Sequence, residues 1–208
     1  YVFKYSNFLD HAEYFRSLRS TVRNRIKKSN IQNFEFKVLR ELNSSDKEDF
    51  LKIIKEISIK HNSLHVPSWV LESLIRHENF IFFGVYHKNS LVAASAGIQV
   101  GNMVWLSWIG SKKDYQKMCV NNFLYSQVIF VAINQNLDIN FGRSRAGSGT
   151  SIFKLNFNLI ETPIKVSSQK YYLFMLGDAI FKFCRIPFLV PKFRKYPLLN
   201  NIFFYIGV

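Results

Sequence analysis

Three apolar runs follow one another in the middle of the chain, and short polar links separate them. The runs span residues 80–87, 91–100 and 103–109. The links, Lys88-Asn89-Ser90 and Gly101-Asn102, consist of residue types that favour tight turns. Runs of this length with links this short predict antiparallel strands connected as hairpins.

Residues 11–29 show the 3.6-residue periodicity of one amphipathic helix. Its apolar stripe consists of Phe15, Leu18, Val22 and Ile26. A basic stripe of Arg16, Arg19, Arg23 and Lys27 lies beside it, and six basic residues accompany a single acid, Glu13. Two interpretations stay open: a docked helix with a solvated face, or an electrostatic platform for phosphate.

The remaining elements alternate between helix and strand. Residues 33–42 alternate as a strand, and a capping box at Ser45-Asp46-Lys47-Glu48 predicts a helix to about residue 60. Pro67 suits the first turn of another helix. A helix over 118–136, a strand over 137–141, a short helix and strands near 159–166 and 169–173 complete the order. Asn121 and Asn122 are good residues to cap the 118–136 helix.

Composition narrows the class of partner. The 208 residues suit one domain, and the absence of an initiator Met suggests a fragment of a longer protein. The net charge of +14 favours an anionic partner such as tRNA, an acidic membrane surface, a phosphorylated lipid carrier or coenzyme A. The two cysteines, Cys119 and Cys184, fit free thiols in a reducing compartment.

The sequence predicts neither a metal site nor a membrane-spanning helix. No Cys/His cluster has metal spacing. Residues 118–137 come closest to the roughly 18 apolar residues of a spanning helix, but Asn and Gln interrupt them. Residues 174–208 mix apolar and basic side chains and contain three prolines. This segment either packs onto the domain or contacts a membrane interface.

A glycine-rich turn follows the strand predicted over 137–141. Gly142, Gly147 and Gly149 lie within eight residues, and a helical turn is expected from Thr150. Such a turn before a helix presents free N–H groups to an anion, and Arg143, Arg145 and Lys154 add positive charge. The spacing fits neither a Walker loop nor a dinucleotide fingerprint. The alternative is a tight turn with solvated arginines.

The string Phe141-Gly142-Arg143-Ser144, then Gly147 or Gly149, then Phe153-Lys154, resembles the signature of FemAB-like proteins. These belong to the GNAT acyltransferase superfamily, in the branch of peptidoglycan bridge-forming aminoacyltransferases and related envelope polysaccharide enzymes. Two positions depart from the pattern: Asn140 replaces an Asp, and Phe157-Asn158 replaces Trp-Gly. The resemblance covers roughly residues 15–175.

The resemblance implies an α/β GNAT-like fold with a central mixed, mostly antiparallel sheet flanked by helices. We expect a basic helical lead-in over 1–30, the GNAT-like domain over 31–173 and an extension over 174–208. In this fold two neighbouring strands splay apart and leave a cleft for the acyl donor. Here that cleft would lie between Trp105–Ser107–Ile109 and Asn140–Gly142.

The resemblance also implies the site residues. Arg143, Lys154 and Tyr125 are the catalytic candidates, Tyr125 as the acid for a leaving thiolate. For Tyr125, core packing is favoured over this role. For Arg143 and Lys154, the structural alternative is an ion pair that holds the turn, for example with Asp138 or Glu161. The substrate-binding candidates are Trp105, Ser107, Asn122, Gly142, Ser144, Gly147, Gly149 and Thr150.

The expected activity is transfer of an acyl or aminoacyl group to an amine of a cell-envelope precursor. The donor would be acyl-CoA or aminoacyl-tRNA, with no metal, in the cytoplasm or at the inner face of a bacterial membrane. Residues 111–118 lack the glycines with which many relatives hold acetyl-CoA, although Lys112, Lys113 and Lys117 offer point charges. The alternative function is a catalytically inactive module that binds a membrane surface or RNA.

Overall fold

The computed structural model describes residues 1–60 and 68–162. The chain forms two compact units, one of Tyr1–Ile53 with Leu74–Thr162 and the other of Ile54–Ser73 with Pro163–Val208. The predicted extension over 174–208 and the strand over 169–173 lie outside the described residues. Of the strand predicted near 159–166, the described part shows one bridge, between Ile160 and Val2.

The first unit contains a six-stranded sheet in the order β1-β6-β5-β4-β3-β2. The strands are β1 (Val2–Phe3), β2 (Glu35–Leu39), β3 (Phe80–His87), β4 (Ser90–Val100), β5 (Met103–Ser111) and β6 (Asp138–Asn140). Neighbours run antiparallel except β5 and β6, which are parallel. The two predicted hairpins β3–β4 and β4–β5 are therefore confirmed, and so is the mixed, mostly antiparallel sheet flanked by helices.

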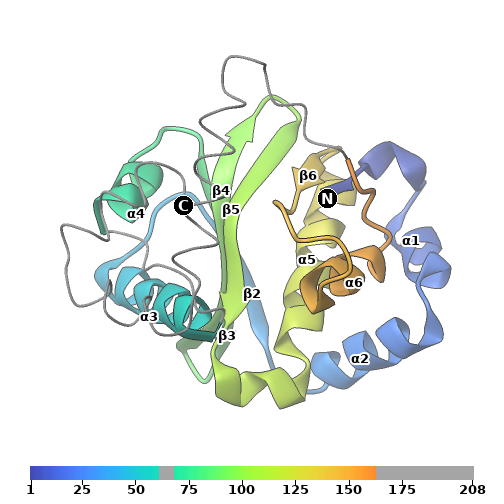
Figure 1. The fold of residues 1–208 in the computed structure, drawn as a ribbon, viewed down its shortest axis with the longest axis horizontal. Coiled ribbons are helices and arrows are strands. Elements are labelled where there is room, and N and C mark those ends of the chain that lie inside the picture. The colour runs from blue at the N-terminus through green and yellow to red at the C-terminus, as the bar shows by residue number, and fades with distance from the viewer. Residues whose placement is uncertain (61–67, 163–208) are drawn as a thin grey trace. The chain divides into compact units, whose positions relative to one another are not determined.

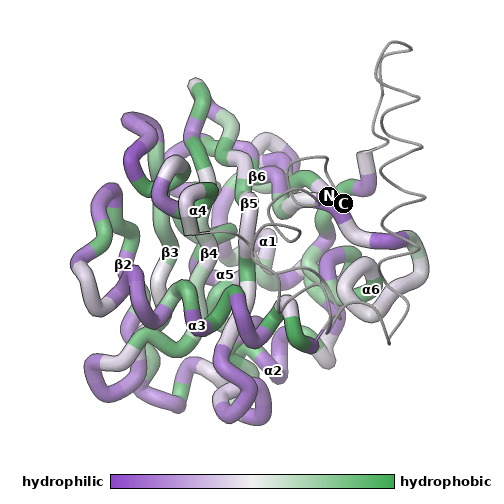
Figure 2. Tube along the Cα trace, turned by 60° about the vertical axis from the view of Figure 1, so that its left-hand side comes forward, coloured by the Kyte–Doolittle hydropathy of each residue, from purple (hydrophilic) through white to green (hydrophobic). Residues whose placement is uncertain are grey.

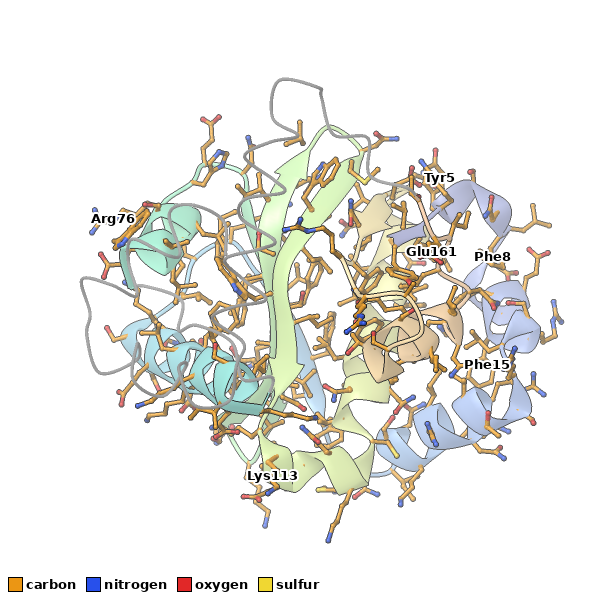
Figure 3. All side chains as sticks on the ribbon, viewed as in Figure 1. Tyr5, Phe8, Phe15, Arg76, Lys113 and Glu161 are labelled. Carbon is orange, nitrogen blue, oxygen red and sulfur yellow. The ribbon has the colours of Figure 1, made fainter. Side chains whose placement is uncertain are left out.

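Helices α1 (His11–Ser17), α2 (Ser20–Asn30), α5 (Val120–Asn134) and α6 (Gly149–Leu155) lie together on one side of the sheet (Figure 1). A 3₁₀ turn (Lys113–Met118) leads into α5, and another (Tyr5–Asn7) follows β1. Tyr5, Phe8 and Phe15, labelled near α1 in Figure 3, pack against the core on this side.

The opposite face of the sheet receives the start of α3 (Ser44–Lys60). Side chains alternate between the two faces of a strand, so Ile81 and Phe83 point to the α5 core while Phe82 points away from it. The ring of Phe50 in α3 meets that of Phe82 edge-on at 5.2 Å. Because β3 is covered on both faces, all but its last residue are buried. Helix α4 spans Ser68–Ile75.

The helix predicted over 11–29 is two helices, because Leu18 and Arg19 are extended between them. Leu18, Val22 and Ile26 are buried as predicted, so the apolar periodicity continues across the break and conceals it. The Arg23 guanidinium donates to the carbonyl oxygens of Arg16 and Leu18 and so satisfies acceptors at the end of α1.

The helix cap predicted at Ser45 lies two residues earlier. The Asn43 side-chain oxygen accepts from the Asp46 amide at 2.8 Å, and its Nδ2 donates to the Asp46 carboxylate at 3.0 Å. Asn43 thus caps the helix, and Asp46 returns a contact to the Asn43 side chain, whereas the box predicted for Ser45 and Glu48 uses the backbone amide of the cap residue. Asn is at least as good a cap as Ser, which explains the shift.

A β-bulge interrupts the β4–β5 ladder beside Gly97. Ala96 is opposite Trp108 but Gly97 is opposite Leu106, so Ser107 has no register partner. A Cβ atom on Gly97 would lie 2.0 Å from the carbonyl oxygen of Trp105. Only glycine fits at this position, because its neighbour is backbone and not a flexible side chain.

Replacing this glycine will destabilise the protein. We expect Gly97→Ala to lower the free energy of unfolding by about 2 kcal/mol or more, because the bulge must deform to accept the methyl group. Gly149→Ala is the matched control, because Gly149 has open space around its Cβ position and no positive φ. Urea denaturation compares the two variants; equal stability would contradict the close approach.

Candidate active site

Strands β5 and β6 part after three paired residues. The parallel pairs are Met103–Asp138, Val104–Ile139 and Trp105–Asn140. Beyond them β6 ends, whereas β5 continues through the bulge to Ser111. The bulged Ser107 and the side chain of Trp105, which is 53% exposed, lie at this parting. The pairing ends at the place where the predicted cleft would begin, and the Cβ position of Gly142 is 3.4 Å from the carbonyl oxygen of Leu106.

The chain turns sharply at Gly142, directly after β6. Gly142 has φ +72°, in the left-handed region that glycine tolerates. Its amide donates to Oδ1 of Asn140 at 2.8 Å. Asn140 stands where the FemAB-like pattern has Asp, and its amide oxygen makes a hydrogen bond that a carboxylate oxygen could also accept. The departure at this position therefore keeps the turn.

Lys154 holds the turn from inside. Its side chain is 2% exposed, and Nζ donates to the carbonyl oxygens of Phe141, Gly142 and Arg143 at 2.6, 3.1 and 3.2 Å. These three acceptors match the three N–H groups of an ammonium. The Tyr1 ring lies 5.2 Å from Nζ. Burial nevertheless lowers the pKa of Lys154 to about 8, because the charged form loses hydration.

The two acids proposed as ion-pair partners of the turn lie elsewhere. Asp138 binds Nζ of Lys4 at 2.5 Å and accepts from the Tyr5 amide. Glu161 accepts from the Tyr1 hydroxyl at 3.2 Å. Lys154 therefore binds backbone oxygens where the sequence suggested a carboxylate.

The outer part of the turn is exposed and basic. Arg143, Arg145, Gly147, Gly149 and Thr150 are exposed, and Ser144 is half-buried with its hydroxyl donating to the Arg143 carbonyl. No carboxylate within the described residues pairs with Arg143. Its guanidinium is thus available for an anionic group of a substrate.

Tyr125 lies in an aromatic cluster behind the turn. Its ring is 4% exposed, stacks on Phe141 at 4.7 Å between centroids, and meets Phe153 and Phe157 at 4.9 and 5.3 Å. Burial raises its pKa far above the ordinary value of 10. The hydroxyl is therefore protonated at neutral pH. The ring is packed in the core, which was the alternative to a catalytic role. The role of Tyr125 as an acid stays a prediction.

Asn122 is a buried amide in the first turn of α5. It is 6% exposed, and its Nδ2 has no hydrogen-bond partner in the structure. The same holds for Oγ of Ser111, at the end of β5. Buried polar groups are normally paired, so each calls for a water or a ligand atom. The cap of α5 is Cys119, at φ +60°, and not Asn121 or Asn122 as predicted.

Lys112 is engaged away from the turn. Its Nζ lies 3.3 Å from Asp49 and 3.4 Å from the Ser90 hydroxyl. The 3₁₀ turn that follows contains no glycine. This segment therefore differs from the glycine-rich loop that the family resemblance led us to look for at this position.

The described residues contain neither a metal-ligand cluster nor a membrane-spanning helix. No group of three or more His, Cys, Asp or Glu side chains among them could hold a metal ion. No described helix has the length and apolar character needed to cross a membrane.

Three features of the site were not found from sequence. They are the bulge at Ser107, the backbone role of Lys154 and the unpartnered amide of Asn122. An isolated glycine inside a strand is a signal for a bulge, and Gly97 was available as that signal. The other two depend on contacts between distant elements.

No family model and no curated protein matches the chain. Solved structures do resemble it. FemX superposes with a TM-score of 0.59 at 8% identity, over 74% of this chain and 56% of that one. A possible acetyltransferase from Clostridium difficile 630 gives 0.55 at 14% identity, over 65% and 95%. The C-terminal domain of a lysylphosphatidylglycerol synthetase from Agrobacterium fabrum gives 0.54 at 9%, over 70% and 55%.

Identities this low show the fold alone. The chain has the fold of the GNAT acyltransferases, as the sequence resemblance implied. The FemAB-like branch remains a prediction from the sequence signature.

Removing the Lys154 ammonium will destabilise the turn. Lys154→Met leaves the Phe141 carbonyl oxygen without its donor, whereas the carbonyls of Gly142 and Arg143 keep the Tyr1 ammonium and the Ser144 hydroxyl. One unsatisfied buried group costs about 1–3 kcal/mol. We expect the free energy of unfolding to fall by about 1–3 kcal/mol, against less than about 0.5 for Lys55→Met at an exposed position. Chemical denaturation followed by circular dichroism measures both; wild-type stability in Lys154→Met would contradict the assignment.

The lowered pKa of Lys154 predicts that the free energy of unfolding depends on pH. Its pKa falls from 10.5 in the unfolded chain to about 8 in the folded one, so the folded state binds fewer protons between these values. Its contribution to stability therefore rises with pH across that window and is least favourable below pH 8. The difference in unfolding free energy between wild type and Lys154→Met should increase from pH 8 to 10. A constant difference would contradict the lowered pKa.

Proposed function

We propose that the protein transfers an acyl or aminoacyl group to the amine of a cell-envelope precursor, with acyl-CoA or aminoacyl-tRNA as donor. The parting of β5 and β6 carries the proposal. The pairing of the two strands ends there, the bulged Ser107 of β5 is exposed, and a basic turn follows β6. The GNAT fold and the FemAB-like signature support it.

The reaction needs few side chains. The amine nitrogen attacks the acyl carbon, a tetrahedral oxyanion forms, and the bond to the donor sulfur or oxygen breaks. Backbone N–H groups near the bulged Ser107 suit the oxyanion, because a bulged residue is left out of the ladder. The amine loses a proton and the leaving group gains one. Tyr125 is the candidate acid, and the ordered strand backbone holds the donor.

The other site residues bind and position. The Arg143 guanidinium would bind a phosphate or carboxylate of the donor or acceptor. The Asn122 amide has an unused donor that suits a carbonyl oxygen of the donor. Trp105 offers an exposed ring to the acyl or acceptor group. Lys154 contacts backbone, so we assign it the positioning of Gly142, Arg143 and Ser144.

One observation favours a second function. The segment after β5 contains no glycine and forms a 3₁₀ turn, and Lys112 within it is paired with Asp49. A GNAT fold that has lost donor binding would act as a binding module for an anionic partner, such as a membrane surface or RNA.

Arg143→Gln separates these functions. We expect transfer to fall at least about tenfold, because a charge-assisted hydrogen bond to the substrate is lost, with the melting temperature unchanged. The assay follows acylation of a lysine-containing peptidoglycan precursor with acetyl-CoA, longer acyl-CoAs or aminoacyl-tRNA. Arg145→Gln, at an exposed position of the same turn, is the matched control.

Two outcomes would count against the proposal. Equal losses in both arginine variants would mean that the turn contributes only general positive charge. Absence of both transfer and donor-dependent thermal stabilisation, with every donor, would favour the binding module.

A further inference from the structure

Helix α2 has a basic surface that its own stability does not explain. Six basic residues and no acid occur from Arg16 to Lys28. The first turn of α2 contains no acidic residue, and Arg19 at its N-cap makes no capping hydrogen bond. Cations near a helix N-terminus oppose the helix dipole, and Lys27 and Lys28 alone are in the favourable last turn. Arg19, Arg23 and Lys27 also repel one another at i,i+4 spacing.

Most of these cations are unpaired. Arg16, Arg19, Arg25, Lys27 and Lys28 are exposed, and none of them pairs with a carboxylate within the described residues. Arg23 is the exception, because it caps the end of α1 through the carbonyls of Arg16 and Leu18. We call the six residues Arg16, Arg19, Arg23, Arg25, Lys27 and Lys28 together the α2 basic surface.

The apolar stripe of α2 is buried in the fold, and the large apolar side chain exposed at its end is Ile31, at the C-cap. Val22 and Ile26 of α2 are 3% and 4% exposed and pack in the core with α5. Hydrophilic residues dominate the segment labelled α2 in Figure 2, and the exposed positions of this helix are all polar. A helix whose apolar stripe is already buried cannot bury it in a lipid interface. Its partner must therefore be recognised by charge.

The distribution of the charges distinguishes two kinds of anionic partner. With 3.6 residues per turn, Lys27 lies on one flank of the outer side beside Arg23, which is engaged with the α1 carbonyls, and Arg25 and Lys28 lie on the other flank. The uncharged Ser20 and Asn24 lie between them. The crest is polar, so a lipid interface would find no apolar side chain to bury there. Phosphates that approach from both sides would meet the two flanks.

We propose that the α2 basic surface binds the phosphodiester backbones of a double-stranded nucleic acid. The paired backbones of a duplex supply rows of phosphates on either side of a groove, which match the two flanks of α2. DNA and RNA share this chemistry, and the surface reads no base. The inference does not rest on the proposed acyl transfer, since none of its residues belongs to the candidate active site.

Fluorescence anisotropy of 20-base-pair DNA and RNA duplexes with the full chain tests the inference. Lys27→Gln/Lys28→Gln removes one cation from each flank, and Lys55→Gln/Lys60→Gln removes the same net charge from exposed positions of α3. We expect the first variant to bind about tenfold more weakly near 0.1 M salt. Its slope of log K against log salt should be smaller in magnitude by about 2, and the control should match wild type. Circular dichroism verifies that both variants fold.

Tight binding of either duplex with this pattern supports the inference, and the preferred duplex identifies the source of the phosphates. Equal loss in the control variant would overturn it, because any positive charge would then suffice. Failure of both duplexes to bind would also overturn it. So would binding of phosphatidylserine vesicles that is stronger than duplex binding and is lost in Lys27→Gln/Lys28→Gln.

Discussion

A buried ammonium that binds three consecutive carbonyl oxygens determines the geometry of the candidate site. The carbonyls of Phe141, Gly142 and Arg143 turn toward Nζ of Lys154. The β5–β6 ladder ends at Trp105 and Asn140, directly before these carbonyls. Lys154 therefore fixes the chain at the point where β6 stops pairing with β5. The aromatic cluster of Tyr125 excludes water from behind it.

The sequence was most informative where hydrophobic pattern and local turn chemistry agreed. The hairpins of β3, β4 and β5 were predictable, because each strand is a buried run between strong turn signals. The break between α1 and α2 was not, because the apolar spacing continues from Leu18 to Val22 and Ile26 across it. The local pattern of apolar residues shows which side of an element is buried. A break between two helices that keeps the same side buried cannot be detected from that pattern.

The sequence indicated the turn after β6 but not the contacts within it. The glycine turn and its charged residues were identified, yet Lys154 was expected to meet an anion and instead meets backbone. The residue type and spacing are the same for both roles, and only burial distinguishes them. The Asp138 carboxylate binds Lys4 and the Tyr5 amide, contacts that span more than 130 positions in sequence. No local pattern encodes such a pair.

The α2 basic surface and the candidate active site differ in how they use positive charge. In the turn, Lys154 is desolvated and satisfied by backbone, while Arg143 is exposed beside it. On α2 the cations are spread over an outer side whose inner stripe is committed to the core. The first arrangement suits one oriented small group, and the second suits a repeating polyanion.

Amide hydrogen exchange with and without donor tests most directly whether the parting of β5 and β6 is the donor site. Acetyl-CoA, a long-chain acyl-CoA and aminoacyl-tRNA would each be added in excess to the full chain. We predict slower exchange in the bulged part of β5, around Ser107, and in the turn from Gly142 to Gly149 with at least one donor. Protection by a bound donor that spares both segments would contradict the assignment of the site.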